Sequence, residues 1–310
     1  MYKSILVPLD GSKLAEQVLP YVSLLAKAHQ TPIQLLRVFD PVTHELAGQA
    51  GGQYTDRLAT AFRNDATTYL GQVATSLRST GVEISVAALE GDPASHIISE
   101  AERHPETLVA MTTHGRSGVG RWVLGSITDK VLHSTTSLML ITRAKSDEEF
   151  SAEVSLGMLI VPLDGSLLAE QSLPYVAALA QPLDAKVSLV RVTPSVEELM
   201  GAISTQQMEV TFGADLPSPE ALAQEGDGNA KTYLDRIKEG LNQQGATSVD
   251  TQVLHGTPAA AIVDFARGAS DNLTVITTHG RSGLGRWLLG SVTDRVVRDS
   301  GNPVLVVRSS

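Results

Sequence analysis

The sequence predicts an α/β fold with two tandem, doubly wound domains that are related by a pseudo-twofold axis. Each domain is expected to hold a five-stranded parallel sheet with the strand order 3-2-1-4-5. Three observations predict this fold. The chain has 310 residues, enough for two domains of the usual ~100–200 residues. Its second half repeats its first half, and in each half short apolar segments alternate with segments of helical periodicity.

The repeat is clear at two places. The segment Val7-Pro8-Leu9-Asp10-Gly11-Ser12 returns unchanged at residues 161–166, and residues 113–126 return at 278–291 with 12 of 14 positions identical. The offset grows from 154 to 165 residues between these places, so the second copy carries 11 extra residues. Most of them fall within residues 193–229, which are rich in Gly, Pro, Ser and Gln and are predicted to form a long loop or lid. We place the first domain at residues 1–145, a charged linker at 146–156 and the second domain at 157–310.

The strands of the first half are predicted from short apolar runs rich in Val, Ile and Leu, which suit strands that are buried on both faces. Gly81 closes the second helix, and Pro93 stands in the first turn of the third. The second half repeats the elements of the first and ends with a strand at residues 304–307. In chain order, the predicted strands cover residues 4–9, 33–39, 83–89, 108–111 and 138–142, and the helices, which show apolar residues at helical spacing, cover 12–28, 56–79, 93–103 and 126–133.

Composition excludes several classes of protein. The chain has no Cys, which rules out disulfides, thiol nucleophiles and Cys-ligated metals. Its net charge of −10 argues against nucleic-acid and membrane partners, and no apolar run is long enough for a membrane span, so we expect a cytoplasmic protein. The sequence lacks a Walker-type phosphate loop, a Gly-x-Gly-x-x-Gly fingerprint, a nucleophile elbow and any His–carboxylate cluster with metal-ligand spacing.

The repeated residues mark a site. Ligands of doubly wound sheets bind beyond the carboxyl ends of the strands, where the strand order reverses. The best-repeated residues follow the first strand, at Asp10-Gly11-Ser12, and the fourth strand, at Thr112-Thr113-His114-Gly115. They can form one site only if strands 1 and 4 are neighbours, which is why we expect the order 3-2-1-4-5.

The glycine-rich segment after the fourth strand suits a bulky anion. Its glycines let the backbone approach a ligand, because no Cβ intervenes. Gly125-Ser126 then opens a helix whose free N–H groups and dipole favour phosphate. The glycines are Gly115, Gly118 and Gly120; Ser126 and Thr128 add hydroxyl donors, Arg116 and Arg121 add positive charge, and Asp10 can accept hydrogen bonds from a base or a sugar.

Structural interpretations of the same residues stay open. Ser126 with Asp129 matches a capping box, which would explain the serine without any ligand. Asp10 can simply cap the first helix or hold the turn. We interpret His114 and His279 as hydrogen-bonded loop residues, Trp122 and Trp287 as packing anchors, and Arg121 and Arg286 as surface charges.

These residues resemble the universal stress protein family, and a tandem member in particular, over both halves except the linker and the insertion. Nucleotide-binding members of that family carry Gly-x2-Gly-x9-Gly-Ser/Thr after the fourth strand. Here Gly115, nine residues and Gly125-Ser126 match the later part of the pattern, as do Gly280, nine residues and Gly290-Ser291. The first glycine of the pattern is Thr112 in one half and Thr277 in the other, which places a Cβ where the family's backbone passes close to the ligand.

The resemblance implies an adenine nucleotide in each half, ATP or AMP, with Mg²⁺ accompanying the phosphates. It places adenosine near Asp10 and Asp164 and adenine against the backbone at Val38 and Val192. We predict no catalytic residue and no protein metal ligand. The expected nucleotide-binding residues are Pro8, Leu9, Asp10, Val38, Thr112, His114, Gly115, Arg116, Gly118, Gly125, Ser126 and Thr128, and in the second half Pro162, Leu163, Asp164, Val192, Thr277, His279, Gly280, Arg281, Gly283, Gly290, Ser291 and Thr293.

We therefore expect a stress-response protein that binds adenine nucleotide as a regulatory ligand. A slow ATPase, in which Asp10 or His114 orients water, and a nucleotide-free scaffold that acts through protein partners are the alternatives. Family members usually dimerise by pairing their last strands antiparallel, so the two halves are expected to form an internal pseudo-dimer with residues 137–142 beside 303–307, and the whole chain can pair further into a homodimer.

Overall fold

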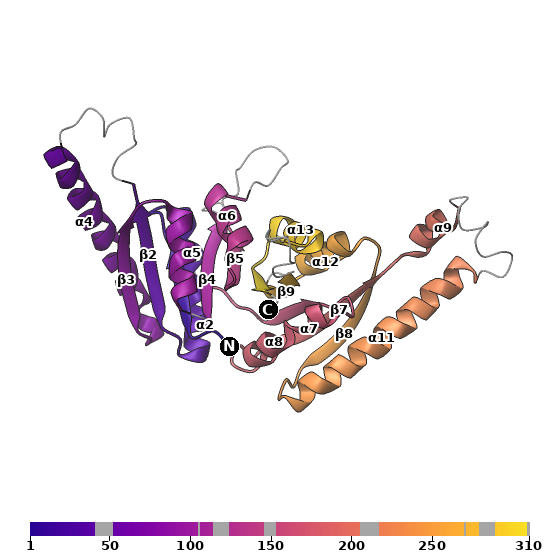
Figure 1. Cartoon of the computed structure of the whole chain (residues 1–310). Coiled ribbons are helices and arrows are strands. Elements are labelled where there is room, and N and C mark those ends of the chain that lie inside the picture. Colours follow the sequence, from indigo (N-terminus) through magenta and orange to yellow (C-terminus); the bar gives the residue numbers. More distant parts are fainter. Residues whose placement is uncertain are drawn as a thin grey trace. The chain divides into compact units, whose positions relative to one another are not determined.

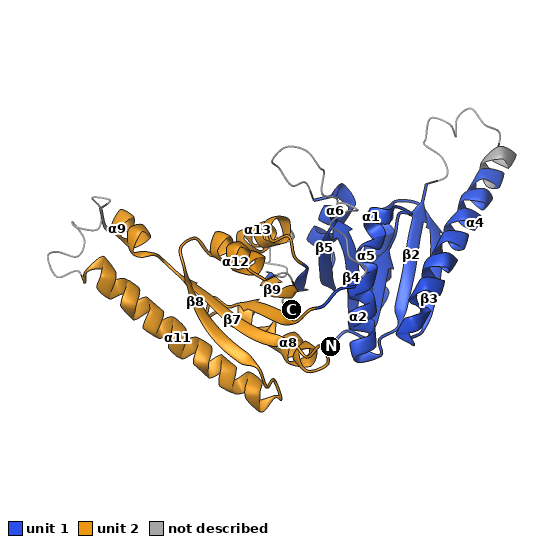
Figure 2. Ribbon diagram, turned by 180° about the vertical axis from the view of Figure 1, so that it is seen from behind, with its two compact units in different colours: residues 1–155, 278–289, 303–310 blue, residues 156–277, 290–302 orange. Residues whose placement is uncertain are grey.

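The computed structural model describes residues 1–40, 52–104, 106–113, 124–145, 153–204, 217–269, 271–278 and 289–308. The chain forms two compact units, coloured separately in Figure 2. Unit 1 contains residues 1–155, 278–289 and 303–310, and unit 2 contains residues 156–277 and 290–302. The C-terminal residues of the second half therefore belong to the unit that the first half builds.

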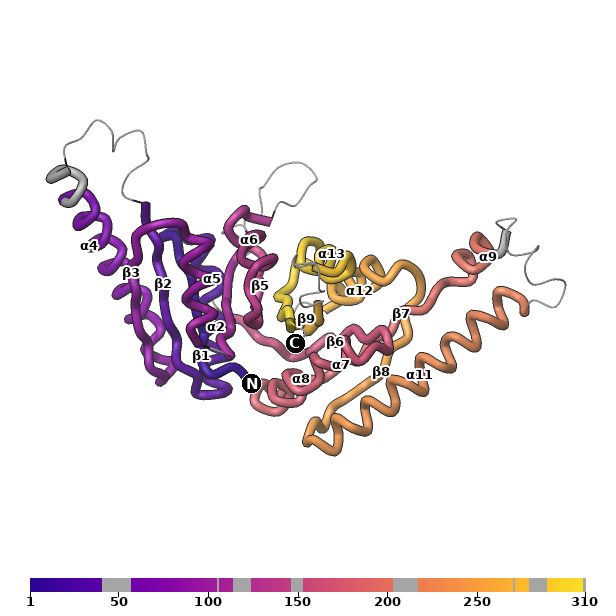
Figure 3. The backbone as a smooth tube through the Cα atoms, viewed as in Figure 1, coloured from indigo at the N-terminus to yellow at the C-terminus, as the bar shows by residue number. Residues whose placement is uncertain are grey.

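Unit 1 contains the strand order that the sequence predicts. Its strands lie in the order β3-β2-β1-β4-β5-β10; the first five are parallel, and β10 is antiparallel to β5. Figure 1 labels many of the elements, and Figure 3 lets the alternation of strands and helices be followed along the chain. They are β1 (Ser4–Pro8), α1 (Lys13–Glu16), α2 (Leu19–His29), β2 (Ile33–Phe39), α4 (Gly52–Ser76), a 3-10 turn η1 (Leu77–Thr80), β3 (Ile84–Glu90), α5 (Pro93–Arg103), β4 (Thr107–Thr113), α6 (Ser126–Ser134), β5 (Leu138–Arg143) and β10 (Val304–Arg308).

Unit 2 repeats this plan with parallel strands in the order β8-β7-β6-β9. Its helix α11 packs against β7 and β8, and α12 packs against α13. Its elements are β6 (Met158–Pro162), α7 (Leu167–Glu170), α8 (Leu173–Ala180), β7 (Lys186–Thr193), α9 (Val196–Ser204), α11 (Pro219–Gln243), β8 (Val249–His255), α12 (Pro258–Arg267), β9 (Asn272–Thr278) and α13 (Ser291–Asp299).

Two predicted elements need correction. The single helix expected at residues 12–28 is interrupted between α1 and α2, because Pro20 has no N–H to continue the helical ladder and instead stands in the first turn of α2. The long loop expected at residues 193–229 is wrong for its described part, which forms α9 and the beginning of α11. Ser195 and Glu198 make a reciprocal capping box at α9, which the sequence carries as Ser-x-x-Glu.

The antiparallel pairing expected for the last strands is present inside unit 1. Val304 lies opposite Ile141, and Val306 lies opposite Met139. Residues 304–307 are all buried, as strands covered on both faces should be. The edge that β5 would otherwise expose is thus covered by a strand from the other end of the chain.

The two faces of unit 1 carry different helices. On β2, Leu36 and Val38 point to one face and Arg37 to the other, because side chains alternate along a strand. Helix α5 packs on β2 and β4 and beside α6, whereas α4 packs on β2 and β3. None of the helices in the described segments is both long and apolar enough to cross a membrane.

Candidate functional site

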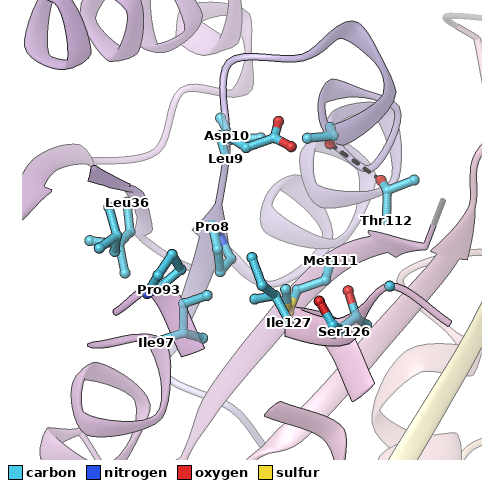
Figure 4. Close-up of a pocket in the computed structure, with 14 residues that line it drawn as sticks. Pro8, Leu9, Asp10, Leu36, Pro93, Ile97, Met111, Thr112, Ser126 and Ile127 are labelled. Atoms are coloured by element: carbon cyan, nitrogen blue, oxygen red, sulfur yellow. Dashed lines mark hydrogen bonds between the residues drawn. The ribbon is translucent and has the colours of Figure 1, made fainter. Parts of the chain in front are cut away.

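A cavity of about 200 Å³ lies at the carboxyl ends of β1 and β4 in unit 1. The turn after β1 forms one wall and the first turn of α6 another, with α5 and the end of β2 between them (Figure 4). Its lining residues are Pro8, Leu9, Asp10, Ala15, Leu36, Val38, Pro93, Ile97, Met111, Thr112, Gly125, Ser126, Ile127 and Thr128.

The cavity brings together predicted site residues from four separate places in the chain. His114, Gly115, Arg116 and Gly118 lie outside the described residues. The apolar walls are not predicted by the sequence pattern, although Leu36 stands two residues before Val38 on the same strand face. The predicted residues that line the cavity are Pro8, Leu9, Asp10, Val38, Thr112, Gly125, Ser126 and Thr128, and the missed ones are Ala15, Leu36, Pro93, Ile97, Met111 and Ile127.

Asp10 begins a tight turn after β1. The backbone N–H of Ser12 donates to Asp10 Oδ1 at 2.8 Å, and the Ser12 hydroxyl accepts from the N–H of Ala15 at 3.1 Å, which caps α1. Gly11 has φ +92°, a conformation that favours glycine. The structural role considered for Asp10 is therefore real: it holds the turn while its side chain also lines the cavity.

A glycine, and not the serine, caps α6. Gly125 is the N-cap, no side chain caps the helix, and Ser126 is its first helical residue. The N–H of Asp129 donates to the carbonyl of Gly125 at 2.8 Å. The capping-box interpretation of Ser126 and Asp129 is therefore wrong, because Ser126 stands one position too late to be the cap.

Helix α13 begins in the same way. Gly290 is its N-cap, also without a side-chain cap, and Ser291 is the first helical residue. A helix that begins without a side-chain cap presents its first N–H groups, and the positive end of its dipole, to whatever lies in front of it. At α6 this is the cavity.

Thr112 occupies the position of the family's first glycine. Its hydroxyl donates to the carbonyl of Ala15 at 3.2 Å, the dashed line in Figure 4, and lies 3.2 Å from the hydroxyl of Thr142. The side chain thus joins β4 to α1 and β5. In unit 2 the carbonyl of Thr277 instead accepts a hydrogen bond from Thr293 at 2.9 Å.

The cavity is apolar over most of its wall, and Asp10 is the only charged residue among the described residues that line it. Outside it, Lys130 of α6 pairs with Asp92, the N-cap of α5, at 3.1 Å. Hydrogen bonds from Ser95, together with Lys130, lower the pKa of Asp92 to about 2. This pair joins the two helices that contribute to the cavity wall.

Unit 2 carries the equivalent residues. Its turn after β6 repeats the first, with the N–H of Ser166 donating to Asp164 at 2.9 Å. Burial alone would raise the pKa of Asp164, but hydrogen bonds from Ser166 and the charge of Arg191 outweigh it, so the pKa lies below its ordinary range.

The sequence offsets align every position that lines the cavity with a residue of unit 2. All but three of these positions carry the same residue, and the three exchanges are apolar: Val190 for Leu36, Ile276 for Met111 and Val292 for Ile127. His279, Gly280, Arg281 and Gly283 lie outside the described residues. The other predicted site residues of the second half all fall within unit 2: Pro162, Leu163, Val192, Thr277, Gly290, Ser291 and Thr293.

In neither unit do the described residues include three or more His, Asp or Glu grouped to hold a metal ion.

Comparison with known proteins gives consistent matches. The universal stress protein family profile matches twice, at residues 1–143 and 158–308. A universal stress protein of Mycolicibacterium smegmatis is 24% identical over 308 residues, covering 98% of this chain and 96% of the relative. One from Methanocaldococcus jannaschii is 31% identical over 150 residues, covering 48% of this chain and 81% of the relative. The crystal structure of a universal stress protein from Archaeoglobus fulgidus matches the whole of both chains, with a TM-score of 0.73 at 21% identity.

Proposed function

The chain belongs to the universal stress protein family, and on that premise we propose that each of its halves binds an adenine nucleotide as a regulatory ligand. The observation that carries the proposal is the first turn of α6, which lacks a side-chain cap and opens into an apolar cavity with one carboxylate on another wall. An uncapped helix start favours an anion, and an apolar wall favours a flat ring. A nucleotide contains both groups.

The base would lie against the apolar wall. Leu36, Val38 and Ile97 supply this surface from β2 and α5. The end of β2 also offers backbone polar groups at Val38, where the family resemblance implies adenine. Asp10, beside this wall, can accept hydrogen bonds from ribose hydroxyls, which a carboxylate does well when it is ionised.

The phosphates would lie at the first turn of α6. Gly125 has no side chain to obstruct their approach, and the following N–H groups point toward the cavity end of the helix. The hydroxyls of Ser126 and Thr128 add donors on the same turn. Mg²⁺ would enter with the phosphates and keep most of its water ligands.

Calorimetric titration of nucleotide-stripped protein with ATP, ADP and AMP tests the proposal, with GTP as the control for the base. We expect two binding equivalents per chain, because almost all lining positions are the same in the two halves. Absence of heat with every adenine nucleotide, at concentrations well above physiological, would overturn the assignment and favour the nucleotide-free scaffold. If wild-type protein releases phosphate from ATP and Asp10→Asn does not, the site also hydrolyses ATP slowly.

A further inference from the structure

A cluster of charged and aromatic side chains lies behind the cavity, on the opposite face of β2. The guanidinium of Arg37 stacks over the ring of Tyr69 at 5.1 Å and pairs with Asp65 at 3.0 Å, both residues of α4. The hydroxyl of Tyr69 donates to Glu16 of α1 at 3.1 Å. Burial, with the charge of Glu16, raises the pKa of Tyr69, so its hydroxyl stays protonated and remains a donor.

Arg37 is packed directly against the turn that carries Asp10. A Cβ placed on Gly11 would lie 3.2 Å from Nη2 of Arg37 and 3.3 Å from its Cζ. The turn is therefore held from behind by the guanidinium and from one end by α1, which Glu16 links to Tyr69. Because Leu36 and Val38 face the cavity, Arg37 faces away from it and reaches the site only through this turn.

The second half repeats the contacts of arginine with tyrosine, glutamate and glycine. Arg191 stacks over Tyr233 at 5.0 Å, Tyr233 donates to Glu170 at 3.1 Å, and a Cβ on Gly165 would lie 3.2 Å from Arg191. The positive charge of Arg191 is also one of the influences that lower the pKa of Asp164.

The outer parts of the two clusters differ. In the first half Lys13 of α1 pairs with Glu16 at 2.9 Å. In the second half Leu167 replaces that lysine, and Arg236 of α11 pairs with Glu170 at 3.0 Å instead. The contacts between glycine, arginine, tyrosine and glutamate are thus retained in both copies, while the cation at their edge comes from a different element.

We propose that Arg37 and Arg191 are positioning residues for recognition of a nucleoside hydroxyl. Each holds its turn so that the carboxylate of Asp10 or Asp164 is presented to a sugar hydroxyl, while the arginine itself does not touch the ligand. This inference rests on the proposed nucleotide site. It separates two tasks: the apolar wall and α6 bind base and phosphate, and the arginine-backed turn distinguishes a sugar with hydroxyls from one without.

The test compares ATP with 2′,3′-dideoxy-ATP, which lacks the hydroxyls. A Gly290→Val background confines the titration to the first half. We expect Arg37→Met to weaken ATP binding about tenfold, the size of one hydrogen bond to a charged group, and to leave the affinity for dideoxy-ATP unchanged. Arg37→Lys should restore part of the lost affinity for ATP. Arg78→Met, at an exposed arginine of η1, should change neither affinity.

The outcomes separate the two proposals. If wild-type protein binds neither nucleotide, the nucleotide site itself fails. If it binds both and Arg37→Met lowers both equally, or neither, the positioning role is overturned and the cluster serves only to attach α4. Tyr69→Leu removes the ring beneath the guanidinium and tests the proposal even if Arg37→Met does not fold. It must reduce the preference for ATP over dideoxy-ATP. An unchanged preference in a folded Tyr69→Leu protein also overturns the proposal.

Discussion

Gly125 and Gly290 show how one residue at a helix start decides what the helix can bind. With a serine as N-cap, the side-chain oxygen would accept a hydrogen bond from one of the first N–H groups of the helix. The structure places glycine at both N-caps and serine one position later. The serine hydroxyl is then placed on the first turn as an additional donor, where it lines the cavity of unit 1.

Replacing both glycines by valine should remove nucleotide binding and leave the fold intact. Gly125 has φ −56°, which valine adopts without strain, but its side chain would stand where phosphate must approach. Each single variant should retain about half of the bound nucleotide. ATP at a hundredfold excess over Kd should stabilise wild type by about 2.7 kcal/mol per site and the double variant not at all, as measured by thermal unfolding.

Ser126→Ala should have a smaller effect on affinity, of about 0.5–1.5 kcal/mol for one hydroxyl. Because Ser126 is not the N-cap, the Tm of the ligand-free protein should stay near that of wild type. A clear loss of Tm without nucleotide would contradict this and would return the serine to a structural role.

The exposed carboxylate of Asp92, which accepts hydrogen bonds from Ser95 and from Lys130, predicts a pH dependence of stability. The pKa of Asp92 is lowered to about 2 in the folded protein, against about 3.9 in an unfolded chain. The contribution of Asp92 to the free energy of unfolding is therefore fully present above pH 4 and is lost as the pH falls toward 2. The free energies of unfolding of wild type and Asp92→Asn, measured with urea, should differ most near pH 5 and converge near pH 2. A difference that is constant with pH would refute this assignment.

At the scale of elements, local sequence signals explain most of the predicted strands and helices. A local signal also explains helix α9, which the sequence analysis does not predict. The strands follow from apolar runs, and Pro20 accounts for the break between α1 and α2. The overlooked signal is the capping box of Ser195 and Glu198, which begins a helix inside a segment whose Gly, Pro and Ser content indicates a loop. Composition averages over a segment, whereas a cap acts at one residue.

Helix α9 should restrict ligand exchange in the second half only. It follows β7, the strand that carries Val192, and Glu198 links it to Thr257 at the start of α12, with 3.3 Å between the oxygens. Glu198→Ala removes this link and the capping box together, so nucleotide exchange should become faster when the first site is blocked by Gly125→Val. Met200→Ala, at an exposed position of the same helix, is the control. Equal exchange rates in the two variants would instead favour a partner-binding role for α9.

At the scale of the whole molecule, the last strand of the second half stabilises the unit built by the first. Leu305 lies opposite Leu140 in the pairing of β10 with β5, and both are buried. Leu305→Ala should reduce the free energy of unfolding by about 2–5 kcal/mol. The loss should appear in hydrogen exchange as weaker protection of the β5 amides, far away in sequence. Leu167→Ala, at a leucine that is 83% exposed, should have no such effect; intact β5 protection in Leu305→Ala would contradict the coupling.

The sequence by itself determined the duplication, the α/β class, the strand order of unit 1 and, through the repeated residues, two of the walls of the cavity. These features are encoded locally, in periodicity and in the turn residues that follow strands 1 and 4. Only the tertiary structure decided that α5 supplies a further wall, that glycine and not serine caps α6, and that Arg37 supports the turn of Asp10 by resting on Tyr69. Gly11, Arg37 and Tyr69 are far apart along the chain, and their contact depends on how α4 packs on the sheet. No spacing in the sequence reports such packing, because the register between distant elements is set by the fit of their side chains.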